Sequence, residues 1–353
     1  MTPQPTLCLP LRWLRQGGSA HFMHQFQAYL QARDWPHITD FEAAPCDIIL
    51  TNAWSMPYPV LWHYKQHRKA VRLVHRVDGV AQEYGRTDGT DILQADVNRL
   101  ADATIYQSAY SQAAQRRHHL ITADGPVIHN PVDLARFAPR PQYHKPAAPP
   151  RLISVSWSSN PHKGLWRIPE LARAHPHLEF QVVGPLPKDG DLPPNLTHID
   201  RVPHTDLPDL LRQADIYLSL LENDACPNVI LEALASGLPI IYLPSGGVPE
   251  LVHEAGVALS ESAALAQAVS TIMADYPGFA RRARATAEGH YAPQDVFARY
   301  LAHMLTAQRQ PLPQAADHRR AMWHHYSYVL AEQGRKWRRI LRGQQTLSGK
   351  LRR

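Results

Sequence analysis

The chain has 353 residues, 44% of them hydrophobic, which is enough to bury two cores of ordinary domain size. Its three cysteines, Cys8, Cys46 and Cys226, have neither the even count of a disulfide framework nor the spacing of a zinc site, so we expect a cytoplasmic protein. The formal net charge is +6, no stretch is apolar enough to span a bilayer and the first residues lack the apolar core of a secretion signal, so integral membrane and secreted classes are not expected.

The first part of the chain predicts alternating strands and helices. Residues 6–13 are a strand candidate, residues 15–19 form a turn that contains Gly17 and Gly18, and residues 20–30 have the pattern of a helix. A further strand candidate, residues 71–77, ends in the polar side chains of His75, Arg76 and Asp78. Because α/β proteins bind ligands at the carboxyl ends of their strands, these three residues are candidates for a site.

A proline-rich stretch over residues 141–150 predicts a semi-rigid connector between two halves. Before it, residues 101–108 resemble a strand that ends in serine, and residues 127–133 contain His129, the second histidine candidate. We therefore expect a first domain over residues 1–140, a second over 151–295, and C-terminal helices with a basic tail over 296–353.

The second half opens with a strand candidate over residues 151–157 that ends at Trp157. A polar turn, Lys163 and a helical pattern over residues 165–174 follow. A lysine after a strand is a compact cation that can neutralise a diphosphate, although most loop lysines are only solvated. Further strands are expected over residues 179–184, 196–200 and 256–259, and further helices over 265–276 and 296–305.

Residues 215–250 predict a parallel strand-loop-helix-strand unit with two carboxylates at its ligand-binding edge. The strand is residues 215–221, the polar loop holds Asp224, and Pro227 suits the first turn of a helix that carries Glu232. The amides near Asn228 are free to meet an anion or a sugar hydroxyl. The alternative is an ordinary turn with a solvated aspartate and an exposed glutamate.

The same segment resembles the signature of glycosyltransferase family four, the group 1 glycosyl transferases. That family shows an acid, seven intervening residues, Glu-Ala, then a small residue with Gly-x-Pro and a Gly-Gly turn. This chain matches the pattern with Asp224, Glu232-Ala233, Ser236-Gly237-Leu238-Pro239 and Gly246-Gly247. Weaker likeness, at residues 15–19, 101–108 and 127–139, extends the resemblance over most of the first three hundred residues.

The resemblance implies the GT-B fold, an α/β architecture of two Rossmann-like, doubly wound parallel-sheet domains facing a central cleft. It implies transfer of a sugar from a nucleotide diphosphate to a hydroxyl, with retention of configuration and no metal or other cofactor. Its catalytic candidates are His75, Lys163, Asp224 and Glu232. Its substrate-binding candidates are Gly17, Gly18, Arg76, Asp78, Trp157, Asn228, Gly246 and Gly247.

Within that resemblance, Lys163 and the glycine turn would hold the donor diphosphate, Glu232 the ribose and Asp224 the donor hexose. His75 would approach the reacting sugar, with Arg76 and Asp78 supporting it or binding the acceptor.

Two positions depart from the family pattern. The first acid is usually glutamate, so Glu222 is an alternative to Asp224. The family's phosphate-binding arginine is replaced by Trp157, which leaves Lys163 to carry the charge alone or with His162 or Arg167.

These departures keep two rival functions open. The first is a catalytically silent subunit that binds a sugar nucleotide or glycan for a partner enzyme. The second is a different enzyme on the same architecture, an epimerase or a phosphorylase. The partners expected of the transferase are a nucleotide sugar and a glycan or lipid-linked acceptor, as in bacterial surface polysaccharide or lipopolysaccharide synthesis.

The basic tail after residue 318 combines arginine and lysine with apolar side chains at roughly helical spacing. Such a segment can lie on an anionic membrane surface, which would make the protein peripheral on the inner face of the membrane. The alternative is a helix packed on the first domain. Nucleic acid is an unlikely partner, because no recognition motif accompanies the charge.

Overall fold

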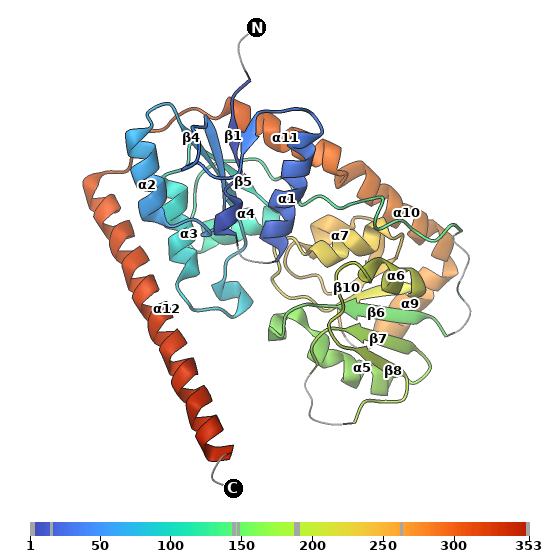
Figure 1. Ribbon diagram of the computed structural model, residues 1–353. Helices are drawn as coiled ribbons and strands as arrows, with labels where there is room; N and C mark the ends of the chain where they lie inside the picture. Colours follow the sequence, from blue (N-terminus) through green and yellow to red (C-terminus); the bar gives the residue numbers. More distant parts are fainter. Residues whose placement is uncertain are drawn as a thin grey trace.

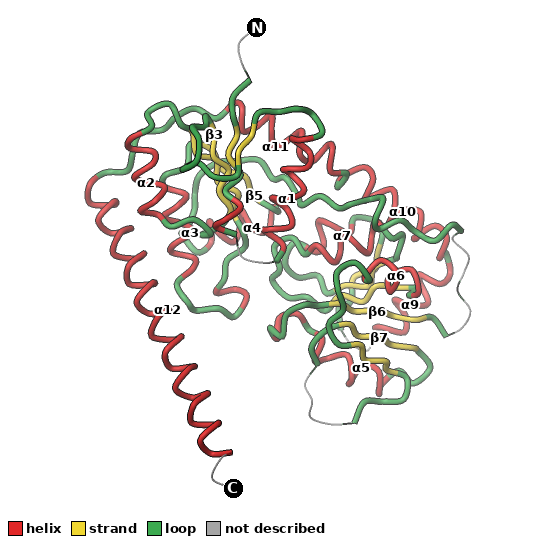
Figure 2. Tube along the Cα trace, in the orientation of Figure 1, coloured by secondary structure: helices red, strands yellow, loops and turns green. Residues whose placement is uncertain are grey.

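The computed structural model describes residues 4–14, 17–142, 146, 149–186, 191–261 and 264–350, of which 337–350 are described by their backbone alone. Two parallel sheets form the centres of two lobes that lie side by side (Figures 1 and 2). Two predicted segments lie partly outside the described residues: the glycine turn, at residues 15 and 16, and the proline-rich connector.

The first lobe is built on a five-stranded sheet in the order β2-β1-β3-β4-β5. Its strands are β1 (Leu7–Cys8), β2 (His37–Ile38), β3 (Ile48–Asn52), β4 (Arg72–Val77) and β5 (Ala103–Tyr106). Its helices are α1 (Gly18–Gln31), α2 (Tyr58–His67), α3 (Thr90–Arg99) and α4 (Ala109–Arg117). The strand expected over residues 6–13 is shorter, because Pro10 is followed by a turn of 3-10 helix at Leu11–Trp13.

The second lobe is built on a six-stranded sheet in the order β11-β10-β9-β6-β7-β8. Its strands are β6 (Arg151–Val155), β7 (Glu179–Val183), β8 (Leu196–Ile199), β9 (Ile216–Ser219), β10 (Ile240–Tyr242) and β11 (Gly256–Ala258). Its helices are α5 (Ile168–Ala174), α6 (Leu207–Gln213), α7 (Asn228–Ala235), α8 (Val248–Val252), α9 (Leu265–Ala274) and α10 (Tyr276–His290). All pairings in both sheets are parallel, which needs helical crossovers on the sheet faces.

Helix α10 was not predicted, and its start explains why the helix expected over residues 265–276 ends early. Asp275 leaves helical geometry, with φ −134° and ψ 47°, and its side chain accepts a hydrogen bond from the Gly278 amide. A cap of this kind, followed by proline in the first turn, ends one helix and begins the next.

The chain then returns to the first lobe. Helix α11 (Pro293–Thr306) packs Phe297 and Tyr300 against Phe22 and Phe26 of α1, and Figure 1 shows α10 and α11 running from one lobe to the other. The final helix, α12 (Ala315–Lys350), buries Ala321 in the core beneath α2 and α3 and then extends away from the body. None of the described helices is long and apolar enough to cross a membrane.

Candidate active site

A cleft of about 670 Å³ lies between the lobes, at the carboxyl ends of both sets of strands. This is the place where open α/β sheets bind ligands. The structure brings most of the predicted site residues to its walls. They are Gly17, Gly18, Arg76, Asp78, Trp157, Lys163, Asp224, Asn228 and Glu232.

The loop between β9 and α7 holds Asp224 at the cleft wall. Gly246 and Gly247 shape this loop from behind and do not line the cleft, which corrects their prediction as substrate contacts. Gly246 has φ +64°, and a Cβ there would lie 2.4 Å from the backbone oxygen of Asp224. The Gly247 amide donates to the same oxygen at 2.8 Å. Any larger side chain would push the loop outward, so the glycines are needed for close backbone packing.

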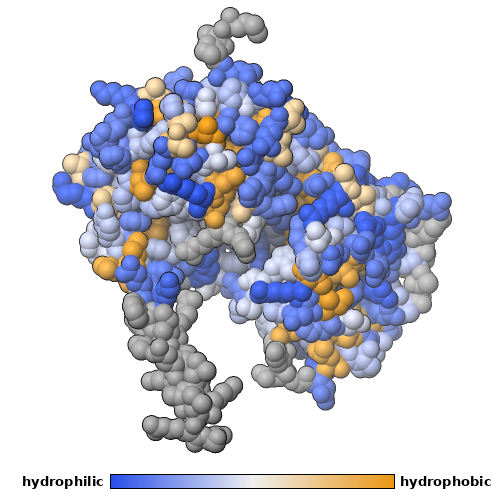
Figure 3. All heavy atoms as spheres, viewed as in Figure 1, coloured by the Kyte–Doolittle hydropathy of each residue, from blue (hydrophilic) through white to orange (hydrophobic). Residues whose placement is uncertain are grey.

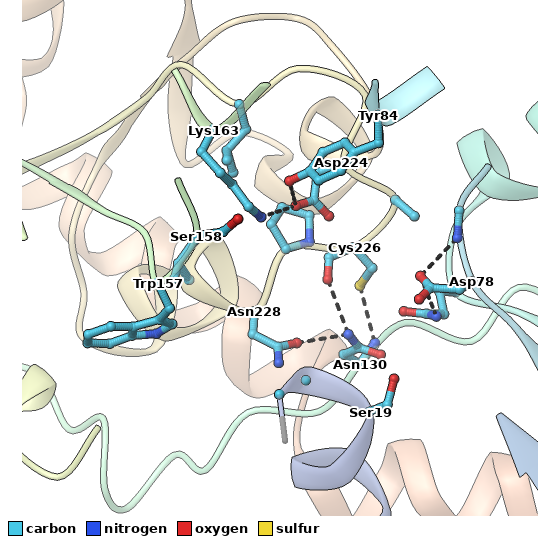
Figure 4. Close-up of a pocket in the computed structure, with 18 of the residues that line it drawn as sticks. Ser19, Asp78, Tyr84, Asn130, Trp157, Ser158, Lys163, Asp224, Cys226 and Asn228 are labelled. Carbon is cyan, nitrogen blue, oxygen red and sulfur yellow. Dashed lines mark hydrogen bonds and ion pairs between the residues drawn. The ribbon is translucent and has the colours of Figure 1, made fainter. Parts of the chain in front are cut away.

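Lys163, Asp224 and Tyr84 form a cluster that joins the two lobes (Figure 4). Lys163 Nζ lies 2.8 Å from Asp224 Oδ2, and the Tyr84 hydroxyl donates to that oxygen at 3.2 Å. Burial lowers the pKa of Lys163, but the charge of Asp224 and contact with Tyr84 outweigh it and raise that pKa overall. The Lys163 ammonium is therefore charged at neutral pH and can bind an anion.

The predicted alternatives to this pair lie elsewhere. Glu222 contacts Arg167 at 3.1 Å and His162 at 3.7 Å, and none of the three lines the cleft. Of the two alternatives for the first acid, Asp224 lines the cleft and Glu222 does not. Arg86, which was not predicted, does line the cleft and pairs with Asp88 at 2.8 Å.

Glu232 sits on the first turns of α7 with one carboxylate oxygen in use and one free. Its Oε1 lies 2.8 Å from His204 Nε2, while its Oε2 is buried and has no hydrogen-bond partner among the described residues. A buried unpaired carboxylate oxygen is costly unless a ligand supplies the donor. Trp157 and His204 approach each other edge to face, with ring centroids 6.5 Å apart, so an aromatic surface adjoins this oxygen.

The opposing wall is the start of α1. Gly17 has φ +127°, and no side chain among the described residues caps the helix, so its first amides lie at the cleft edge without a side-chain partner there. The two lobes approach each other closely here: a Cβ added at Gly18 would lie only 3.3 Å from Asn228 Nδ2. Asn130 bridges the gap, donating to Asn228 Oδ1 at 2.8 Å and to the Cys226 oxygen at 3.2 Å (Figure 4).

The structure does not bring His75 into the cleft, which corrects its prediction as the residue that approaches the sugar. Its side chain is fully buried, with Nε2 2.9 Å from the Ala53 oxygen and Nδ1 3.0 Å from Asn98 Nδ2. Burial lowers the pKa of His75 to about 4 despite the bond to Ala53. Both ring nitrogens are satisfied by a neutral imidazole, so this histidine belongs to the sheet interior.

Arg76 lines the cleft, but its hydrogen bonds are made to other residues of the protein. Its guanidinium donates to Asn52, Asn130 and the Tyr300 hydroxyl and lies over the Phe22 ring, 4.1 Å from its centroid. His129 contacts Glu250 at 3.2 Å and does not line the cleft.

The sequence did not single out Tyr84, and it gave no sign that His204 contacts Glu232 or that Asn130 contacts Asn228, although residues 202–205 were expected to contact the nucleotide base and residues 127–133 resembled the family. Each of the three lies in a loop or turn far along the chain from its partner. No local spacing signals such residues. In the described part of the chain, no cluster of histidine, cysteine and carboxylate side chains has the arrangement of a metal site.

Comparison with known proteins finds a family match within the second lobe. Residues 159–275 match the family described as "Glycosyl transferases group 1". The gpi3 subunit of phosphatidylinositol N-acetylglucosaminyltransferase from Schizosaccharomyces pombe is 30% identical over 120 residues, or 31% of this chain. A glycogen synthase from Mycobacterium tuberculosis is 29% identical over 174 residues, or 45% of this chain. The matches span only 26% and 42% of these relatives' own lengths.

Solved structures match over nearly the whole chain. Sucrose-phosphate synthase from Thermosynechococcus elongatus aligns with a TM-score of 0.67 and 19% identity over 86% of this chain and 100% of that one. The Anabaena protein HepE in complex with UDP aligns with a TM-score of 0.64 and 17% identity over 86% of this chain and 99% of that one. At these identities the likeness shows the fold, which is GT-B.

Proposed function

We propose that the protein is a retaining glycosyltransferase, from the premise that residues 159–275 match the group 1 glycosyl transferases and that the fold is GT-B. It moves a sugar from a nucleotide diphosphate to a hydroxyl of a glycan or lipid-linked acceptor. One observation carries the proposal: a charged lysine and an unpaired carboxylate oxygen, Lys163 Nζ and Glu232 Oε2, line the same cleft between the two lobes.

Lys163 is suited to stabilise the departing diphosphate. Negative charge grows on that group in the transition state, where a preorganised cation lowers the barrier most. The uncapped N-termini of α7 and α1 add partial positive charge and free amides on either side of the cleft. These groups can replace a metal ion at the leaving group, so we propose that transfer requires none.

Glu232 is suited to bind the ribose. Its Oε2 can accept a hydrogen bond from one ribose hydroxyl without displacing His204 from Oε1. Support comes from HepE, a protein of the same fold, whose structures were determined with UDP and with UDP-glucose. Asp224 would accept hydrogen bonds from the donor hexose once its Lys163 partner turns to the phosphates.

Retention follows, in this proposal, from attack of the acceptor on the face that the diphosphate leaves. The acceptor hydroxyl would approach from the first lobe, where Asp78 lines the cleft. The reaction then proceeds through an ion-pair-like state without a covalent sugar-protein intermediate.

The C-terminal helix suits a protein that works at the inner face of a membrane in polysaccharide or lipopolysaccharide synthesis. Trp323, Tyr326 and Leu330 are 68%, 54% and 69% exposed on α12, and Figure 3 shows a small hydrophobic group on this helix above its grey end. Basic residues flank them in the sequence. Flotation of the protein with anionic vesicles tests this, because the wild type should float and a Trp323→Glu, Leu330→Glu variant should not. A wild type that does not float would contradict membrane binding, and equal flotation of both would contradict binding through these side chains of α12.

Thermal shifts with UDP, GDP, ADP and their sugars, with and without Mg²⁺, test the donor site. A nucleotide at about a hundred times its dissociation constant adds roughly 2.7 kcal/mol of stability. The shift should appear without Mg²⁺, and Lys163→Ala and Glu232→Ala should abolish it. Glu222→Ala is the matched control, because this neighbouring carboxylate does not line the cleft.

A silent sugar-nucleotide-binding subunit is the second candidate, favoured by Trp157 in place of the family's phosphate-binding arginine. A nucleotide-sugar shift without release of nucleotide diphosphate in the presence of any acceptor would favour it. If no nucleotide stabilises the protein, both proposals fail.

A further inference from the structure

A second cavity of about 310 Å³ opens from the first-lobe side of the cleft. Gly18, Ser19, Trp54 and Asp78 line both spaces, so the two are adjacent. A ligand in the second cavity would therefore lie next to the place where the donor sugar is expected. Its remaining walls come from the loop between β3 and α2, from α3 and from the C-terminal helix.

Helix α12 closes this second cavity. His325, Tyr328 and Val329 form its outer wall. The helix is held in place, because His324 Nδ1 lies 2.8 Å from Asp96 Oδ2 and the Tyr328 ring lies edge-on to Trp54, with centroids 5.6 Å apart. The cavity thus depends on a segment that the family match at residues 159–275 does not include.

The walls are mostly aromatic and aliphatic. They include Trp13, Leu14, Met56, Tyr58, Leu93 and Val97. Several polar side chains among them are already partnered: the Asn52 amide donates to Ser19 Oγ at 2.7 Å and its oxygen accepts from Arg76, while the Tyr58 hydroxyl contacts His318 at 3.4 Å. Trp13 Nε1 and Ser55 Oγ are buried without a hydrogen-bond partner among the described residues, so the cavity offers few polar atoms to a ligand. A sugar ring needs many hydrogen-bond partners, so this interior suits an apolar group better.

One carboxylate marks the junction with the donor cleft. Asp78 Oδ1 accepts from the Gly79 amide at 2.8 Å and from Gln107 at 3.1 Å, and no hydrogen bond to Oδ2 is found among the described residues. Asp78 can therefore take a hydroxyl at Oδ2 while an apolar group continues into the cavity.

We infer that the second cavity is an acceptor subsite, completed by α12, for an amphiphilic alcohol whose hydroxyl meets Asp78 and whose apolar portion packs against Trp54 and Val329. The inference rests on the proposed transferase function for the meaning of the hydroxyl. It goes further in naming the acceptor class and in assigning the C-terminal helix to substrate recognition.

Photocrosslinking tests the subsite without turnover. The probe is an octyl glucoside analogue with a diazirine in its alkyl chain, used below its micelle-forming concentration and without donor. It should label peptides that contain residues 52–58 and 325–329. Unmodified octyl glucoside should compete, and methyl glucoside should not.

Two adjacent substitutions on α12 provide a matched pair. Val329→Trp fills the cavity and should reduce labelling about tenfold. Leu330→Trp adds the same bulk at a position that is 69% exposed and outside the cavity, so labelling should stay unchanged. Both variants should keep the wild-type nucleotide thermal shift, which shows that they are folded.

Equal labelling of the wild type and Val329→Trp, or equal competition by methyl glucoside, would overturn the inference. The proposed function has a separate test. If the probe labels these peptides but no nucleotide shifts the melting temperature, the transferase proposal is contradicted, while binding of an apolar group in the second cavity is still supported.

Discussion

The two walls of the cleft use charge differently. On the second lobe, Lys163 pairs with a single carboxylate, and Glu232 keeps one buried oxygen that has no hydrogen-bond partner in the described part of the chain. On the first lobe, Arg76 donates to three side chains, and Lys65 pairs with Asp102 in the interior. The charges on the second-lobe wall face the cavity with spare hydrogen-bonding capacity, whereas Arg76 and Lys65 of the first lobe are partnered within the protein. Asp78 is the exception on the first lobe, because its Oδ2 accepts no hydrogen bond from a described residue.

This difference teaches how to separate functional charges from structural ones in an α/β protein. A buried charge is stable only when its hydrogen bonds are satisfied, so a fully partnered one holds elements together. A buried charge with unused capacity at a cavity is the one that a ligand can complete. Substitutions on the two walls should therefore change different quantities.

The largest effect is expected in the interior of the first lobe, at Lys65. Its Nζ lies 2.6 Å from Asp102 Oδ1, and the two side chains are 3% and 0% exposed. Lys65→Met would leave the buried carboxylate without its cation and should lower the free energy of unfolding by about 3–5 kcal/mol. Urea denaturation measures this loss. Nucleotide affinity of the folded protein should not change.

The control for Lys65 is Arg116→Met. Arg116 pairs with Asp124 at 2.8 Å, but these side chains are 46% and 99% exposed. A surface pair of this kind contributes about 1 kcal/mol or less. If both variants lose the same stability, burial does not distinguish the two pairs and the comparison of the walls fails.

Lys163 should show the opposite behaviour. Lys163→Met removes the cation expected at the leaving group, so kcat/KM for sugar transfer should fall about 100- to 1,000-fold, or about 3–4 kcal/mol of transition-state stabilisation. Arg167→Met is the control, because Arg167 pairs with Glu222 outside the cleft. An equal loss in both variants would mean that general positive charge, not the position of Lys163, drives transfer.

Much of the second-lobe wall could be predicted from sequence because its signals are local. A strand, a proline-started helix and a glycine turn fix the neighbourhood of Asp224 and Glu232 within one strand-loop-helix unit. The GT-B fold, which the family resemblance implied, is confirmed, and the alternation of strands and helices along both halves agrees with it. Helix α10 was not predicted, because the break at Asp275 lies inside a continuous helical pattern.

The first-lobe wall could not be predicted in the same way. Strand-end position suggested His75, but the partners that bury it, Ala53 and Asn98, come from other segments. Tyr84 reaches Asp224 only because the lobes face each other. The second cavity depends on Val329, which follows the family match by more than fifty residues. In each of these three cases the position of the residue depends on tertiary contacts, which spacing along the sequence does not predict.

His75 offers a pH test of its structural role. Burial lowers the pKa of His75 from 6.5 to about 4. Between these two pH values the imidazole is protonated in the unfolded chain and neutral in the folded protein. Stability should therefore fall by about 3 kcal/mol at this residue as the pH drops from 7 to 4. Comparing urea denaturation of His75→Gln and the wild type isolates that contribution: the variant should show a correspondingly smaller loss. An unchanged pH dependence would mean that the ring is not held neutral.

The smallest effect is expected at Glu250, a charge on the second lobe that is fully partnered. It accepts from the Ala109 and Tyr110 amides at the start of α4, at 2.8 and 3.0 Å, and contacts His129 at 3.2 Å. Burial raises the pKa of Glu250, but these bonds outweigh it and lower that pKa below 4.5, so its contribution is present above pH 4.5 and is lost as the pH falls.

Glu250→Gln should therefore cost up to about 1 kcal/mol at pH 7 and less at pH 4, measured by urea denaturation, with nucleotide affinity unchanged. An equal cost at both pH values would show that the charge makes no contribution. A loss of nucleotide affinity would be more instructive, because it would mean that the second lobe's charges act on the ligand whatever their partners. Unchanged affinity would instead make hydrogen-bond completeness, rather than the lobe that carries the residue, the property that separates the two walls.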